Sequence, residues 1–130
     1  EDILQPLKVA LENVKPSVLV GSSGSFDTFS SVINPAADDI KSYEHPPASE
    51  IDLTSFVHLC GDMMHNSLKD RLVMKGMPPD RADNIPYAAA IVRWAIENSD
   101  VQKMYRSEYA LREGVLNRLS IGQTIVPALA

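Results

Sequence analysis

The spacing of apolar residues predicts a chain built mostly of helices. Five apolar positions recur every three or four residues within residues 1–15, which predicts an amphipathic helix ended by Pro16: Ile3, Leu4, Leu7, Leu11 and Val14. The same period predicts helices over 26–33, 80–98 and 109–119, the second of them opened by Pro78-Pro79. Another short helix is expected to begin at a cap formed by Asn66 or Ser67 with Asp70, and to end at Gly76.

Between these helices lie two short runs that predict strands, residues 17–20 and 102–107. A long helical crossover joins them, so they are expected to be parallel. Residues 35–47 mix charges with prolines and predict a surface loop. Ser49-x-x-Asp52 resembles a capping box. It precedes a helix whose expected inward positions are Leu53, Phe56, Val57, Cys60, Met63 and Met64.

This order of elements predicts a helix-rich α/β fold with two parallel strands and about five or six helices. Two strands alone form a marginal sheet, and parallel sheets are normally wider and covered on both faces. Residues 1–130 are therefore expected to form a single incomplete domain. The alternative is a complete helical module that binds a partner protein through its sheet edge or an apolar face.

Composition narrows the classes of partner. The chain has 45% apolar residues, 22% charged residues and a net charge of −5, with no basic patch, so we expect no nucleic-acid partner. No apolar run is long enough to span a membrane, and we expect no membrane partner. The single cysteine, Cys60, cannot form an internal disulfide, which fits the reducing cytoplasm.

The first candidate site is the sequence Gly21, Ser22, Ser23, Gly24, Ser25 between the first strand and the next helix. Backbone N–H groups at such a junction can point at an anion, and serine hydroxyls add donors. Alternatively, these residues form a tight turn with a serine cap. An acidic chain attracts no polyanion through its overall field, so local donors of this kind would have to hold a phosphate.

Arg81 is the second candidate, because a guanidinium beside a helix start can clamp a phosphate. The structural alternative, which we favour, pairs Arg81 with Asp80, with Asp83 or with the adjacent loop. Either way, Arg81 and the glycine–serine loop are the two features retained as candidate phosphate ligands.

Other chemically interesting residues are interpreted structurally, and no catalytic residue and no metal site is assigned. His58, Asp62 and His65 share a helix face, but three ligands over two turns reach a common ion poorly. Cys60 is expected to be a buried small hydrophobe, and Asp27 to stabilise a helix N-terminus. Arg112-Glu113 is expected to hold the last helix against the sheet.

Three stretches together resemble the C-terminal half of the exopolyphosphatase/guanosine pentaphosphate phosphohydrolase (Ppx/GppA) family. They are VLVGSSGSFD at 18–27, DRLVMKGMPPDRAD at 70–83 and SEYALREGVL at 107–116. The resemblance covers residues 1–119 and implies part of the second ribonuclease H-like lobe of an actin-like, bacterial cytoplasmic enzyme. It identifies the strands as the fourth and fifth of that lobe, and the loop at Gly21 as part of the cleft between lobes.

The same resemblance implies an activity for the complete protein: release of terminal phosphate from polyphosphate or from a phosphorylated guanosine nucleotide, with Mg²⁺ as cofactor. The family's catalytic carboxylates and its Asp-Gly-Gly-Gly-Ser type loop have no counterpart in this sequence. The chain is therefore expected to be inactive alone, to bind no cofactor itself, and to need the missing N-terminal part of the same protein. A homodimer would be an alternative cover for the open strand edge.

Overall fold

The computed structural model describes residues 2–35 and 47–122. Most of the predicted loop at 35–47 lies outside these residues. In chain order the elements are a 3-10 turn Asp2–Leu4, α1 Gln5–Val14, β1 Val18–Ser22, α2 Gly24–Ile33, β2 Ala48–Ile51, α3 Leu53–His65, α4 Leu68–Leu72, α5 Ile85–Glu97, β3 Lys103–Ser107 and α6 Leu111–Ser120. No helix among the described residues is long and apolar enough to cross a membrane.

The described strands form a three-stranded sheet in the order β1-β3-β2. β1 and β3 are parallel, with Val18 opposite Lys103 and Ser22 opposite Ser107, as the sequence predicts. β2 pairs antiparallel with the other side of β3, and the sequence pattern missed it. The reason is its composition, because Ala48-Ser49-Glu50-Ile51 is short and has one buried residue, Ile51.

The capping box expected at Ser49 is therefore wrong. Ser49 lies within β2, and Asp52 itself caps α3 by accepting a 2.7 Å hydrogen bond from the Ser55 N–H. The inward face of α3 is also partly different from the prediction. Val57 and Met64 are 44% and 65% exposed, whereas Leu59 is buried beside Phe56, Cys60 and Met63.

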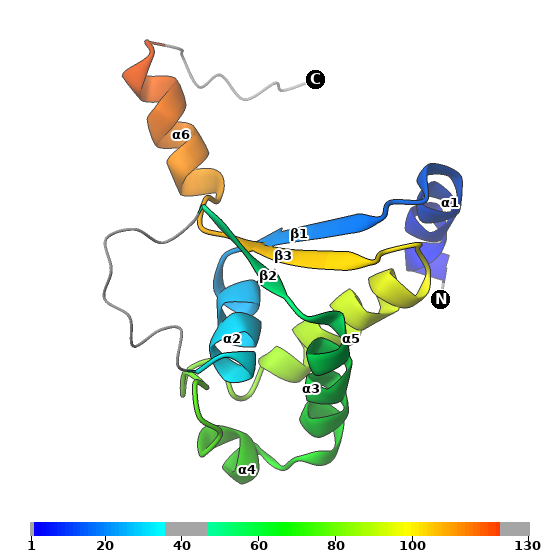
Figure 1. The fold of residues 1–130 in the computed structure, drawn as a ribbon, viewed down its shortest axis with the longest axis vertical. Helices are drawn as coiled ribbons and strands as arrows, with labels where there is room; N and C mark the ends of the chain where they lie inside the picture. Colours follow the sequence, from blue (N-terminus) through cyan, green and yellow to red (C-terminus); the bar gives the residue numbers. More distant parts are fainter. Residues whose placement is uncertain (1, 36–46, 123–130) are drawn as a thin grey trace.

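Helices cover one face of the sheet. Figure 1 shows α2, α3 and α5 gathered on that side, while α1 and α6 lie at opposite ends of the parallel strands. The core is continuous and includes Phe26, Phe29, Ile51, Phe56, Leu59, Cys60, Met63, Met77, Ala82, Ile85, Ala89 and Met104. Phe29 is at its centre, with ring centroids 5.6 Å from Phe26 and 5.0 Å from Phe56, both edge-to-face.

Apolar side chains remain exposed on the other side of the sheet. Val18 and Val20 of the edge strand β1 are 46% and 60% exposed. α1 contains no buried residue, and Ile3 and Leu4 of its predicted apolar stripe lie in the 3-10 turn before it. Both valines point away from the helices, and no described element covers them. Parallel strands are normally covered on both faces, so these valines form an apolar surface of the kind that a further layer covers.

Two predicted helix boundaries are wrong. α4 ends at Leu72, so Gly76 lies in the following loop, where it has a φ of 80°. α5 begins at Ile85, with a proline in its first turn, while residues 78–84 form turns in which the Arg81 N–H donates to the Pro78 carbonyl. Pro78-Pro79 therefore precedes a turn segment and not the helix itself.

Three carboxylates cap helix N-termini and predict a dependence of stability on acid pH. Hydrogen bonds lower the pKa of each: from the Ser55 N–H to Asp52, from the Ser67 side chain to Asp70, and from the Ala110 N–H to Glu113. A carboxylate with a lowered folded-state pKa stabilises the fold above its unfolded-state pKa, and this contribution is lost as pH falls through the folded-state value.

We therefore expect the free energy of unfolding to decrease below about pH 4. In urea unfolding at pH 7 and pH 3, Asp70→Asn should reduce the difference between the two pH values relative to the wild type. Glu12→Gln is the control, because Glu12 lies in the second half of α1, away from its N-terminus. An equal pH difference in wild type and Asp70→Asn would contradict the assigned cap.

Candidate functional site

The predicted glycine–serine loop lies where the carboxyl ends of β1 and β3 meet. Ser22 ends β1 opposite Ser107, and α2 begins two residues later at Gly24. Ser23, between them, is the N-cap residue. Ligands of open α/β sheets bind at the carboxyl ends of parallel strands, so the fold places this loop at the expected edge.

Ser23 has a backbone conformation that favours glycine. Its φ is 68°, and its carbonyl accepts hydrogen bonds from the Phe26 and Asp27 N–H groups at 3.0 and 3.2 Å. Such a conformation costs a non-glycine residue about 1–3 kcal/mol, and strain of this kind is concentrated at functional sites. The Gly24 and Ser25 N–H groups, at the first two positions of α2, have no acceptor within the helix.

The two glycines of the loop have different roles. A methyl group on Gly21 would lie 2.1 Å from the Phe26 ring, so Gly21 is required by core packing. A methyl group on Gly24 would lie 2.4 Å from Nη2 of Arg81. The two features predicted separately from the sequence, the loop and Arg81, are therefore in contact in the structure.

A segment that runs along α2 positions Arg81. Gly76 lies against the Ser31 carbonyl near the C-terminus of α2, and Arg81 lies against Gly24 at its N-terminus. Arg71 fixes the end of this segment that lies next to Arg81. Its Nε donates to the Ala82 carbonyl at 2.7 Å and its Nη1 to the Asn66 carbonyl at 2.6 Å. Residues 70–83 thus hold the Arg81 guanidinium at the N-terminus of α2.

The expected pairing of Arg81 with Asp80 is present, but it is long and exposed. Arg81 Nε lies 3.8 Å from Asp80 Oδ2, with the side chains 47% and 79% exposed. Surface pairs of this kind contribute about 0–1 kcal/mol. The guanidinium therefore remains accessible to a ligand at the α2 N-terminus, where a helix dipole also favours an anion.

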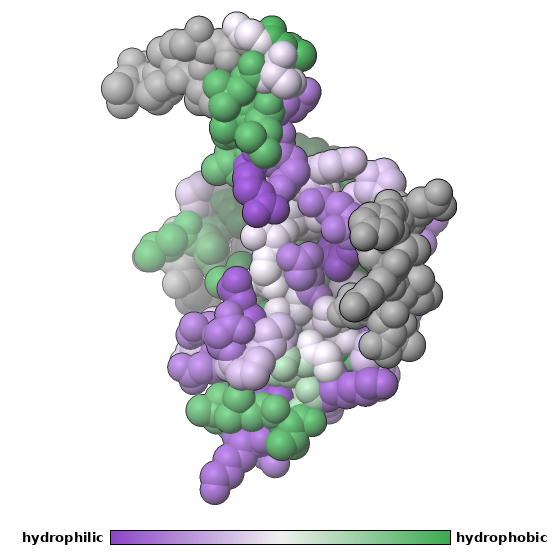
Figure 2. Space-filling model, turned by 90° about the vertical axis from the view of Figure 1, so that its left-hand side faces the viewer, coloured by the Kyte–Doolittle hydropathy of each residue, from purple (hydrophilic) through white to green (hydrophobic). Residues whose placement is uncertain are grey.

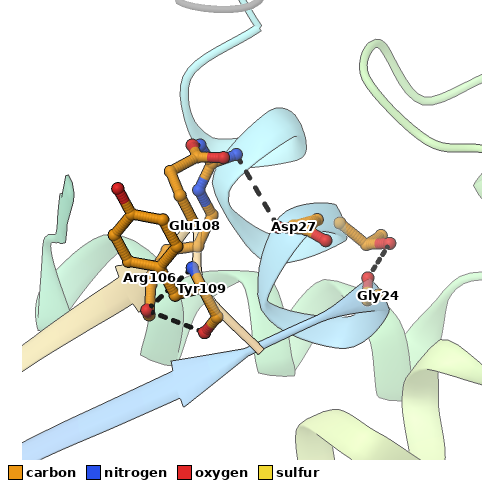
Figure 3. Close-up of polar contacts among 7 residues, drawn as sticks. Gly24, Asp27, Arg106, Glu108 and Tyr109 are labelled. Carbon is orange, nitrogen blue, oxygen red and sulfur yellow. Dashed lines mark hydrogen bonds and ion pairs between the residues drawn. The ribbon is translucent and has the colours of Figure 1, made fainter. Parts of the chain in front are cut away.

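An open hollow of about 810 Å³ adjoins the loop. Its polar wall includes the hydroxyl residues Ser22, Ser23 and Ser107, and its apolar wall is formed by α6 residues such as Leu111 and Val115. Ser107 Oγ donates to the Tyr109 carbonyl and accepts from the Tyr109 N–H, at 2.9 and 3.1 Å, which forms the turn into α6 (Figure 3).

Sequence reasoning missed Arg106, which lies beside this hollow. Its side chain is 15% exposed, and Nη1 lies 3.8 Å from Asp27 Oδ1, while Nη2 contacts Glu108 Oε1 (Figure 3). Asp27 lies in the first turn of α2, as its predicted dipole role requires. A signal for Arg106 existed: it lies two residues after the buried Met104, on the inward face of the strand, where a charge needs a partner.

The other residues considered for chemistry have contacts that indicate structural roles. His58, Asp62 and His65 are exposed on α3, and His65 Nδ1 lies 2.8 Å from the Gly61 carbonyl. Cys60 is buried with Sγ 3.7 Å from the Ala89 carbonyl, and burial raises its pKa to about 11, as expected for a small hydrophobe. Among the described residues no three His, Cys, Asp or Glu side chains gather to hold a metal ion.

The role predicted for Arg112-Glu113 is wrong. Arg112 is 85% exposed and its Nε lies 2.8 Å from Glu113 Oε1, while Glu113 also caps α6. α6 has no buried residue and extends away from the sheet (Figure 1), and its leucines are exposed. Hydrophobic residues gather on the surface of this helix (Figure 2). The pair therefore stabilises the start of α6 and does not hold the helix against the body.

Comparison with known proteins identifies the family. A model of the Ppx/GppA phosphatase family matches residues 1–120. The chain belongs to this family. The resemblance of the three sequence stretches is thereby confirmed. The sequence has no significant match among curated proteins.

Two solved structures show the same Ppx/GppA fold. An exopolyphosphatase from Cytophaga hutchinsonii matches 95% of this chain with 26% sequence identity and a TM-score of 0.81. The Aquifex aeolicus member of the Ppx/GppA family matches 93% with 18% identity and a TM-score of 0.69. The chain spans 39% and 40% of the lengths of these two structures. The predicted helix-rich α/β class and the actin-like fold are thus confirmed.

Proposed function

We propose that this chain forms a phosphate-binding wall of a phosphohydrolase that acts on phosphoanhydrides. The observation that carries the proposal is the contact of Arg81 with Gly24, which places a half-exposed guanidinium at the N-terminus of α2. Family membership and the exopolyphosphatase relative support the reaction class. The proposed substrate is polyphosphate or a phosphorylated guanosine nucleotide.

In the proposed reaction, water attacks the terminal phosphorus, the bridging P–O bond breaks, and inorganic phosphate is released. Arg81, the first N–H groups of α2 and the hydroxyls of Ser22 and Ser23 would bind phosphate oxygens and orient the chain of phosphates. Charge-assisted hydrogen bonds of this kind contribute about 1.5–3 kcal/mol each.

The described residues do not provide the other components of such a site. Asp27 and Glu108 are ion-paired with Arg106, and no cluster of metal-ligating side chains exists among the described residues. The described residues therefore do not form a site for the Mg²⁺ that the family resemblance implies. We propose that residues 1–130 are an incomplete domain, which the uncovered apolar face of β1 and its position at the edge of the described sheet support, and that the chain alone is inactive.

The test compares the complete protein with the 130-residue chain in assays of phosphate release from polyphosphate and from guanosine pentaphosphate. We expect release by the complete protein and none by the chain. Release by the isolated chain would contradict its assignment as one wall of a larger site. No release by the complete protein from either substrate would contradict the proposed reaction.

Replacing Arg81 with alanine in the complete protein should weaken phosphate binding by about tenfold or more, since a charge-assisted hydrogen bond is lost. Arg81→Lys should retain part of the affinity, because it keeps the charge but loses the bidentate geometry. Arg93→Ala is the control, because Arg93 pairs with Glu97 on α5. Unchanged phosphate affinity in Arg81→Ala, with a lowered melting temperature, would assign Arg81 a structural role instead.

A further inference from the structure

We propose that Arg106 is a positioning residue of the phosphate site, one that compensates the carboxylates of Asp27 and Glu108 so that the hollow accepts an anion. This inference rests on the proposed function, since it concerns the binding of phosphate at the same strand ends. Arg106 was not among the candidates predicted from the sequence.

The charges around the hollow require such compensation. Three carboxylates line it, those of Asp27, Glu108 and Glu113. Glu113 has its own partners, Arg112 and the Ala110 N–H. Asp27 and Glu108 both face Arg106. Without that guanidinium, two uncompensated carboxylates would adjoin Ser22 and Ser23, in a chain of net charge −5, and would repel a phosphate.

The geometry assigns Arg106 to positioning and not to ligand contact. Its Nε is buried and has no hydrogen-bond partner among the described residues, so that part of the guanidinium cannot reach a ligand. Its terminal nitrogens face the two carboxylates. Arg106 extends from the helix-covered face of β3 to Asp27 in the first turn of α2 (Figure 3).

The test measures the affinity of the complete protein for inorganic phosphate and for tripolyphosphate by calorimetry. Arg106→Gln should weaken binding by about tenfold, the size expected when one charge is lost several ångströms from a multiply charged anion. The loss should be larger at low ionic strength, where screening is weaker. Arg106→Lys should remain within about threefold of the wild type, since it keeps the charge.

A charge-restoring variant separates compensation from simple structural support. In the triple variant Asp27→Asn, Glu108→Gln, Arg106→Gln, both carboxylates and the guanidinium become neutral. The local charge is then one unit less negative than in the wild type, and we expect affinity at least equal to that of the wild type. Should Arg106→Gln fail to fold, the single variants Asp27→Asn and Glu108→Gln take its place. Each removes a negative charge and should tighten phosphate binding by about threefold or more.

The outcomes are distinct. Equal affinity of wild type and Arg106→Gln would overturn the inference, and so would a triple variant as weak as Arg106→Gln, because loss of support would then explain the defect. Unchanged or weaker phosphate binding in both Asp27→Asn and Glu108→Gln would also overturn the inference. Absence of any phosphate binding by the wild type would refute the proposed function itself, and this inference with it.

Discussion

Replacing Phe29 with alanine is expected to lower the free energy of unfolding by about 3–5 kcal/mol, the range for a large aromatic residue removed from a packed core. Phe29 is fully buried and contacts both Phe26 and Phe56 edge-to-face. It lies on α2 between the sheet and the other helices, so neighbouring elements cannot all move inwards to fill the space. Urea unfolding followed by circular dichroism measures the change.

Tyr87→Ala is the matched control, since Tyr87 is a ring on α5 that is 71% exposed. Its loss should change the free energy of unfolding by less than about 1 kcal/mol. Equal effects of the two substitutions would contradict the position of the core. Because Phe26 also covers Gly21, loosening of this cluster should reach the loop of the proposed phosphate site.

The second large effect is expected at Gly76. Its φ of 80° costs a residue with a side chain about 1–2 kcal/mol. A methyl group there would also lie 2.1 Å from the Ser31 carbonyl oxygen, a backbone atom that cannot rotate away. Overpacking adds about 1–3 kcal/mol, so Gly76→Ala should destabilise the fold by about 2–5 kcal/mol in the same unfolding experiment.

Gly61→Ala is expected to have the opposite effect on the free energy of unfolding. Gly61 lies within α3, and a methyl group there would meet no atom within 4 Å. Alanine is favoured over glycine in a helix interior, so this variant should be more stable by about 0.5–1 kcal/mol. No stability loss in Gly76→Ala would show that the segment does not run along α2 as described. A stability loss in Gly61→Ala would contradict the open surroundings of that position on α3.

Periodicity was sufficient for the elements whose apolar residues share one face. The stripe of α1 and the parallel pair β1 and β3 were predicted close to their observed bounds. β2 was missed because pairing with β3, and not its own sequence, makes Ala48–Ile51 a strand. The start of α5 was misplaced because the hydrogen bond from Arg71 to the Ala82 carbonyl holds residues 78–84 in turns. The local sequence pattern does not indicate this longer-range contact.

The candidate site was predicted as two separate features. The sequence indicated the glycine–serine loop and Arg81 individually, but their contact depends on how the segment from Gly76 to Arg81 lies along α2. Arg106 was missed because its one sequence signal, a position two residues after Met104 in a short strand, is not distinctive by itself. Its burial beside Asp27 and Glu108 becomes visible only once β3 and α2 are packed together.

The central claim is that the strand-to-helix loop and Arg81 together bind phosphate. A crystal structure of the complete protein with saturating inorganic phosphate tests it most directly. We expect a phosphate within hydrogen-bonding distance of the Gly24 and Ser25 N–H groups and of the Arg81 guanidinium. A loop that stays empty at saturating phosphate, or a phosphate bound only at a site distant from Gly24, would contradict the claim.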